Sequence, residues 1–171
     1  MNRNITRIVD GIQTSDGAGV KLKRIIGSPE LNLLDPFLLF DEFGSDNPED
    51  YIAGFPPHPH RGFETITIVE KGLIDHADSM GFSARYGDGD VQWLTAGDGI
   101  QHSEMFPLLN QNKKNKMDFF QIWVNLKSNQ KRVKPNFSMF WKDEIPKVSL
   151  VDHNNIKTEV EVIAGEYKQN N

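Results

Sequence analysis

The chain has 171 residues, of which 37% are hydrophobic and 25% charged, the composition of a globular protein with one hydrophobic core. Its net charge of -5 disfavours non-specific attraction to nucleic acid or to an anionic membrane. There is no cysteine, so thiolate metal sites are excluded and any metal needs nitrogen and oxygen ligands. The sequence has no long apolar segment, which predicts a cytoplasmic protein without a membrane span.

Strand patterns dominate the predicted elements. The first apolar run, residues 32–43, contains Pro36 in its middle and is predicted to form two short pieces of core rather than one helix. Residues 62–72 and 119–126 then alternate as half-buried strands do. In the first strand one face carries Phe63, Thr65, Thr67 and Val69, and the other Glu64, Ile66, Ile68 and Glu70. In the second strand the apolar face carries Phe120, Ile122, Val124 and Leu126, opposite Phe119, Gln121, Trp123 and Asn125.

Glycine-rich turns separate these strands at short intervals. They fall at residues 70–72, 79–81, 87–90 and 96–99, with no helical pattern between them. This spacing indicates an all-β antiparallel sandwich or small barrel. After Leu126 the sequence becomes charged and reads as an exposed connection, followed by one more predicted strand at residues 157–165.

Two histidines in the segment "PPHPHRGFETITIVEKG" are the first candidate metal ligands. His58 and His60 lie two residues apart. Pro57 and Pro59 each favour an extended backbone at the residue that precedes them. Side chains two apart in an extended chain point to the same side, so both imidazoles can reach one ion.

The segment "AGDGIQHSEMF", residues 96–106, repeats this spacing with His102 and Glu104. Two such pairs on facing strands supply three neutral nitrogens and one carboxylate. That set suits Fe, Ni, Cu, Mn or Zn, whereas Ca and Mg prefer oxygen ligands. With four protein ligands, an octahedral metal keeps two positions for substrate or oxygen.

Other polar residues near these motifs have several possible roles. Glu64 shares the parity of His58 and His60, so it is a candidate ligand, a partner for Arg61 or, by preference, an acceptor for an imidazole N–H beside the metal. His76 is predicted to be structural, and His153 to be exposed to solvent. Trp93 is predicted to lie in the core, with the wall of the pocket as the alternative.

The sequence resembles the pirin family of the cupin superfamily. The matching segments are "LDPFLLFDEF" (34–43), "HPHRGFETIT" (58–67), "GDVQWLTAGDGIQHSEMF" (89–106) and "QIWVNL" (121–126). This resemblance implies a cupin double-stranded β-helix barrel that holds one metal, usually iron. It assigns the metal ligands to His58, His60, His102 and Glu104, which favours Glu104 over Glu64 as the carboxylate.

Pirins resemble a pair of barrels, and this chain ends where the second would begin. The expected division is therefore an N-terminal cupin domain at residues 1–128, and a connecting segment with the start of a second domain at residues 129–171. The face that a second barrel would cover is expected to be apolar, and to be exposed unless something else covers it. A homo-oligomer or a poorly soluble protein is the expected consequence.

The resemblance implies two alternative functions. One is a metal-dependent dioxygenase of the quercetin 2,3-dioxygenase type, which uses a flavonol and O₂, with Glu104 as the catalytic group that accepts the flavonol proton. The aromatic residues proposed to contact the flavonol are Phe55, Phe63, Trp93 and Phe106. The other is a non-enzymatic, iron-dependent regulator or adaptor that binds a protein partner.

Overall fold

The computed structural model describes residues 4–167, and these form an almost entirely β structure. The strands are β1 (Ile12–Asp16), β2 (Val20–Ile26), β3 (Phe37–Ser45), β4 (Phe55–His60), β5 (Phe63–Lys71), β6 (Leu73–Asp78), β7 (Ser83–Gly87), β8 (Val91–Thr95), β9 (Ile100–Met105), β10 (Met117–Asn125), β11 (Asn136–Phe140), β12 (Lys147–Val151) and β13 (Lys157–Glu161). Two 3₁₀ turns, η1 (Pro48–Asp50) and η2 (Ser128–Gln130), are the helical elements of the described chain. Within that part of the chain, no helix has the length and apolar character needed to cross a membrane.

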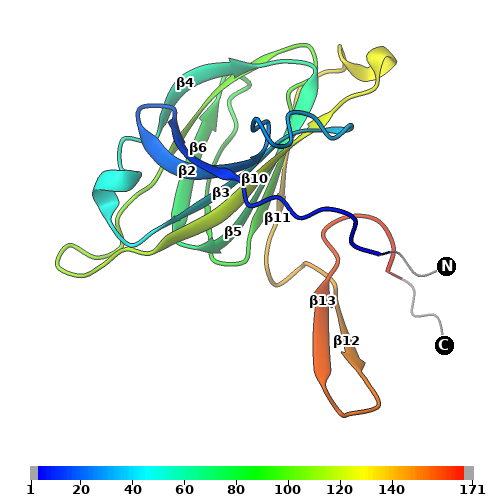
Figure 1. Cartoon of the computed structure of the whole chain (residues 1–171). Helices are drawn as coiled ribbons and strands as arrows, with labels where there is room; N and C mark the ends of the chain where they lie inside the picture. The colour runs from blue at the N-terminus through cyan, green and yellow to red at the C-terminus, as the bar shows by residue number, and fades with distance from the viewer. Residues whose placement is uncertain (1–3, 168–171) are drawn as a thin grey trace.

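Two antiparallel sheets face each other and enclose the core (Figure 1). The larger sheet has the strand order β1-β2-β3-β10-β5-β8-β11, and the smaller sheet the order β4-β9-β6-β7. Strands β12 and β13 pair only with each other and form a hairpin that projects from the body of the molecule (Figure 1). The predicted all-β barrel is confirmed.

Aromatic and branched side chains from both sheets fill one end of the interior. The Phe43 and Phe119 rings stack with their centroids 4.1 Å apart, and Phe106 lies 5.5 Å from Phe119. All three side chains are at most 3% exposed. Because β3, β10 and the loop after β9 meet at these rings, their burial joins the two sheets at this end.

The hydrophobic pattern of β10 would most simply place its apolar face inside the barrel, but the structure has the opposite orientation. The mixed set Phe119, Gln121 and Trp123 points into the barrel, whereas Ile122 and Val124 belong to a cluster on the outer face. On β5, likewise, the buried Thr65 and Thr67 alternate with the outward-facing isoleucines. The apolar face points outward, where it is partly covered, while the interior near the histidines carries polar groups.

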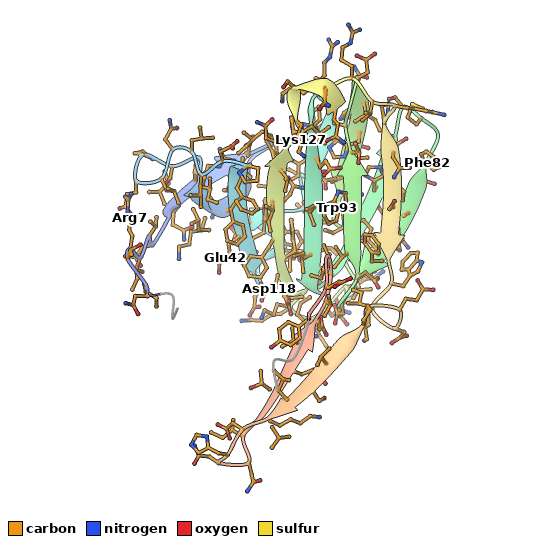
Figure 2. The ribbon with its side chains drawn as sticks, turned by 90° about the vertical axis from the view of Figure 1, so that its right-hand side faces the viewer. Arg7, Glu42, Phe82, Trp93, Asp118 and Lys127 are labelled. Carbon is orange, nitrogen blue, oxygen red and sulfur yellow. The ribbon has the colours of Figure 1, made fainter. Side chains whose placement is uncertain are left out.

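The chain covers part of this outer face with its own later residues. Ile145 and Ile163, on either side of the β12–β13 hairpin, pack into the cluster that contains Ile66 and Trp93. Figure 2 shows Trp93 on this face of the larger sheet, above the projecting hairpin. This outer face is therefore partly buried within the chain itself. Strand β11 extends the larger sheet beyond β8, while the division at residue 128 stays a prediction.

The adjacent residues Phe119 and Phe120 on β10 provide a direct test of which side chains of this strand point into the barrel. Phe119→Ala removes a fully buried ring and is expected to lower the free energy of unfolding by about 3–5 kcal/mol. Phe120 is only half-buried, 5.8 Å from Phe40, so Phe120→Ala is expected to cost less. Urea denaturation of both variants measures the difference, and an equal or larger loss for Phe120→Ala would contradict the assigned facings.

Candidate metal centre

Antiparallel pairing of β4 with β9 brings the predicted histidines together. In this ladder His58 lies directly opposite His102, and His60 lies two residues further along β4. A register shift between Phe55 and His58 marks an irregularity at the start of β4, in the proline-rich stretch. The sequence predicts that both motifs are extended and lie on facing strands. In the structure both are extended, and they lie on neighbouring strands of one sheet.

The three imidazoles form one compact group. The ring centroids are 4.4 Å apart for His58 and His102, and 4.7 Å apart for each of the other two pairs. One nitrogen from each ring lies within 4.8 Å of the other two, which is close enough for all three to bind a single ion. His60 and His102 are buried, and His58 is half-buried.

Hydrogen bonds define which ring nitrogens are available to a ligand. The Nδ1 atom of His58 lies 2.8 Å from the carbonyl oxygen of Pro56, so this nitrogen carries the proton and Nε2 has the lone pair. That Nε2 atom faces the Nε2 of His60 at 3.1 Å. The Nε2 atom of His102 is buried without a hydrogen-bond partner among the described residues. A buried, unpartnered nitrogen beside two others fits metal coordination.

Burial keeps the imidazoles of His60 and His102 neutral. It lowers the pKa of His102 to about 2, with the neighbouring histidines adding to the effect. Burial and the nearby His58 lower the pKa of His60 to about 4. Metal ions bind the neutral imidazole, so both rings are in the form that a metal requires at neutral pH.

Glu104 lies two residues after His102 on β9 and is 3% exposed. The Nε2 atom of Gln121 donates to its carboxylate at 3.3 Å. The orientation of this amide is fixed because the Trp123 indole, which can only donate, bonds the other end of Gln121 at 3.0 Å. Burial raises the pKa of Glu104 to about 7, although the hydrogen bond from Gln121 opposes the rise.

A cavity of about 160 Å³ opens beside these residues. It is lined by Asp16, Gly17, Arg24, Asp41, Phe43, Phe55, Pro56, His58, His60, Glu104, Gln121 and Trp123. Glu104 therefore shares the cavity of two of the histidines, on the side where Gln121 holds it. The cavity is the space in which a small molecule could meet a metal bound by the imidazoles.

The structure corrects the role preferred for Glu64. Between β4 and β5 the chain turns at Gly62, which has a φ of 77°, so the alternation of side chains does not continue from His60. Glu64 falls on the outer face of the larger sheet, where it accepts a hydrogen bond from Thr95 at 2.7 Å. Arg61 pairs instead with Asp98 at 3.0 Å.

The predicted aromatic residues divide between the cavity and other places. Phe55 lines the cavity, and Phe63 lies beside it, stacked on Trp123 and 5.1 Å from the His60 ring. Phe106 belongs to the core beneath. Trp93 is on the outer face, so the alternative that it forms the pocket wall is wrong.

Sequence reasoning missed Gln121 and Trp123, which reach the site from β10. The only signal was their shared parity on that strand, and it could not say which face was inside. His153 is exposed, as predicted. His76 is buried on β6, where it contacts His102.

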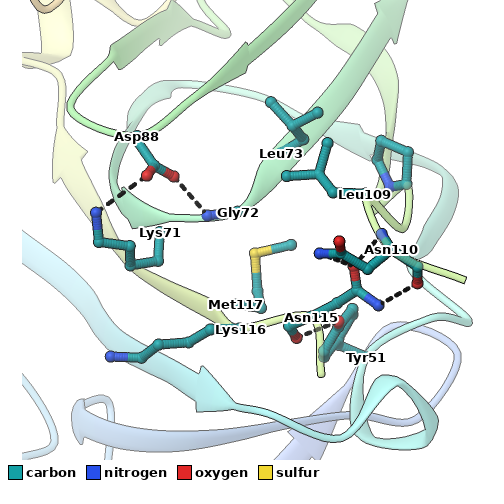
Figure 3. Close-up of a pocket in the computed structure, with 11 residues that line it drawn as sticks. Tyr51, Lys71, Gly72, Leu73, Asp88, Leu109, Asn110, Asn115, Lys116 and Met117 are labelled. Carbon is teal, nitrogen blue, oxygen red and sulfur yellow. Dashed lines mark hydrogen bonds and ion pairs between the residues drawn. The ribbon is translucent and has the colours of Figure 1, made fainter. Parts of the chain in front are cut away.

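A second cavity, at the end of the barrel near Tyr51 and Met117, lacks such chemistry (Figure 3). Its charged groups are paired, Lys71 with Asp88 at 3.0 Å and Lys116 with Asp118 at 2.9 Å. The amides of Asn110 and Asn115 bond within their own loop. The histidine group therefore remains the candidate site.

The two-sheet barrel with its inward group of histidines is the architecture of a cupin. The chain belongs to the pirin family, whose model matches residues 19–124. The chain is 47% identical over 144 residues to a pirin-like protein of Caulobacter vibrioides, covering 84% of this chain and 51% of the relative. Its identity to human pirin is 44% over 149 residues, covering 86% and 48%.

A crystal structure of quercetin 2,3-dioxygenase from Acinetobacter baumannii has a similar fold. The TM-score is 0.78 at 32% sequence identity, and the match covers 93% of this chain and 55% of that chain. The present chain thus spans about half the length of the relatives that it matches.

Removal of one imidazole tests the candidate centre. His102→Ala removes one of the three clustered imidazoles and is expected to leave only traces of metal, measured by elemental analysis after purification. His153→Ala is the matched control, since it removes an exposed imidazole, and both it and the wild type are expected to hold metal stoichiometrically. Equal metal contents in the two variants would contradict the assignment.

Proposed function

We propose that this protein is a metal-dependent dioxygenase of the quercetin 2,3-dioxygenase type, with iron held by His58, His60, His102 and Glu104. The proposal depends chiefly on one observation, the three imidazole nitrogens that lie within 4.8 Å of one another. Glu104 lies outside that group of three, and it is proposed as the oxygen ligand because its buried carboxylate lines the same cavity as His58 and His60. The similarity to the Acinetobacter baumannii quercetin 2,3-dioxygenase supports the reaction type.

The residues of the cavity have distinct roles in this proposal. When bound, the metal supplies a Lewis acid that polarises the flavonol oxygens. Glu104 accepts the proton of the flavonol hydroxyl, because its carboxylate lines the cavity in which the substrate would lie. Gln121 holds this carboxylate in place through its amide N–H.

Aromatic side chains would position the substrate. Phe55 and Trp123 line the cavity, and Phe63 supports Trp123 by stacking at 4.6 Å. Aromatic rings of this kind favour offset or edge-to-face contacts with a planar substrate. The exclusion of water by these rings strengthens the interaction between Glu104 and the substrate hydroxyl.

The size of the cavity favours a second candidate function. Its volume of about 160 Å³ is smaller than the roughly 300–1,000 Å³ of pockets that enclose drug-sized ligands. A flavonol would enter with one ring and extend over the mouth at Asp16 and Pro56, both of which are exposed. The alternative is therefore an iron-dependent regulator or adaptor that binds a protein partner and turns over no flavonol.

Turnover of quercetin in air separates these two functions. Iron-loaded wild-type protein is expected to deplete quercetin with matching consumption of O₂. Glu104→Gln preserves the size of the side chain but removes the base, so kcat is expected to fall by about 10²–10⁴-fold. Metal content is measured in the same samples, because a variant that has lost its iron would be inactive for another reason.

One result would count against the dioxygenase, and another against the role of Glu104. Wild-type protein with stoichiometric iron that consumes neither quercetin nor O₂ would leave the adaptor as the better account. Full activity of Glu104→Gln would instead preserve the dioxygenase and remove Glu104 as its base.

A further inference from the structure

A buried chain of hydrogen bonds approaches His102 from the side away from the cavity. The Nε2 atom of His76 lies 3.1 Å from Oδ2 of Asp78, and both side chains are fully buried. The Nδ1 atom of His76 lies 3.4 Å from Nδ1 of His102. The Phe137 ring lies against the His76 ring with centroids 4.8 Å apart and shields the chain from water.

Asp78 is itself held in a fixed orientation. Its other oxygen, Oδ1, accepts hydrogen bonds from the backbone N–H groups of Met80 at 2.8 Å and Phe82 at 3.1 Å. These two donors close the turn between β6 and β7. The remaining oxygen, Oδ2, is therefore directed at His76 and can only accept a proton from it while the carboxylate is ionised.

The donor and acceptor of each hydrogen bond between Asp78, His76 and His102 follow from the requirements at Asp78 and at His102. At one end Asp78 accepts, so His76 donates through Nε2 and presents a lone pair at Nδ1. At the other end, His102 can offer a lone pair to a metal at Nε2 only if its proton is on Nδ1, where it is donated to His76. The two requirements agree, and the unpartnered Nε2 of His102 is the nitrogen left for the metal.

We propose that Asp78 and His76 are positioning residues, which together hold His102 in the tautomer and orientation that direct its Nε2 lone pair into the metal site. Metal-bound histidines commonly have such an outer partner, usually a carboxylate or a carbonyl on the second ring nitrogen. His58 has this simple arrangement with Pro56. For His102 a second histidine stands between the ligand and the carboxylate. The inference rests on the proposed metal site.

The variant Asp78→Asn reverses this chain with little change in shape. The Met80 and Phe82 N–H groups still need an oxygen acceptor, so the new amide turns its NH₂ group toward His76. His76 must then accept at Nε2 and carry its proton on Nδ1, where it opposes the proton on His102. His102 is driven to the other tautomer, which protonates the nitrogen that binds the metal.

Two substitutions at His76 form a matched pair. Asn has an oxygen close to the position of Nδ1 and can still accept from His102, whereas Leu has the same branching and no acceptor. Zinc is the probe, and its dissociation constant is measured by competition with a chelator. Asp78→Asn and His76→Leu are each expected to weaken zinc binding by about 10–100-fold. His76→Asn should stay much closer to the wild type.

The tautomer of His102 is read directly in the metal-free protein from its imidazole ¹⁵N chemical shifts, assigned by the loss of signal in His102→Ala. The wild type is expected to carry the proton on Nδ1, and Asp78→Asn to carry it on Nε2. A proton on Nε2 in the wild type, or an unchanged tautomer in Asp78→Asn, would overturn the inference. Failure of the wild type to bind zinc, with the expected tautomers observed, would instead count against the metal site alone.

Discussion

The antiparallel register between β4 and β9 is the constraint on which the candidate metal centre depends. It places His58 opposite His102, while the alternation of each strand brings His60 and Glu104 to the same side. A slip of one residue would turn one pair of ligands toward the other face. The register is therefore as important to the site as the identity of its residues.

Burial is the second requirement, and it has a cost. Imidazole and carboxylate groups inside the barrel lose their contacts with water, and an unsatisfied buried polar atom costs about 1–3 kcal/mol. The protein offsets much of this cost with partners around the rim of the site: the Pro56 carbonyl for His58, His76 for His102 and Gln121 for Glu104. The Nε2 atom of His102, which has no hydrogen-bond partner within residues 4–167, is the nitrogen that a metal would satisfy.

The inner face of the larger sheet likewise carries both polar and apolar side chains. Its far end is closed by stacked aromatic rings, whereas the end near the histidines carries polar side chains such as Gln121. The outward faces of β5 and β10 are the more apolar ones, and residues on either side of the β12–β13 hairpin cover part of them. A sheet with both faces covered cannot be oriented from hydrophobic alternation alone.

Glu64 shows where reasoning from the sequence failed. Parity counted along the chain from His60 predicts an inward carboxylate, but the turn at Gly62 separates two strands that belong to different sheets. Trp93 raised the same problem, because a tryptophan fits the core, the pocket wall and a covered outer face equally well. In each case only the position of the strand in the barrel could decide the outcome.

The sequence by itself determined that the chain is an all-β protein with two spaced pairs of candidate ligands, because strand alternation and ligand spacing are local properties. The tertiary structure decided which face of each strand is inside, why Glu64 is excluded from the site, and that Gln121, Trp123, His76 and Asp78 surround the candidate ligands. These contacts join strands that are distant in sequence, so they follow from sheet pairing and closure of the barrel rather than from any local pattern.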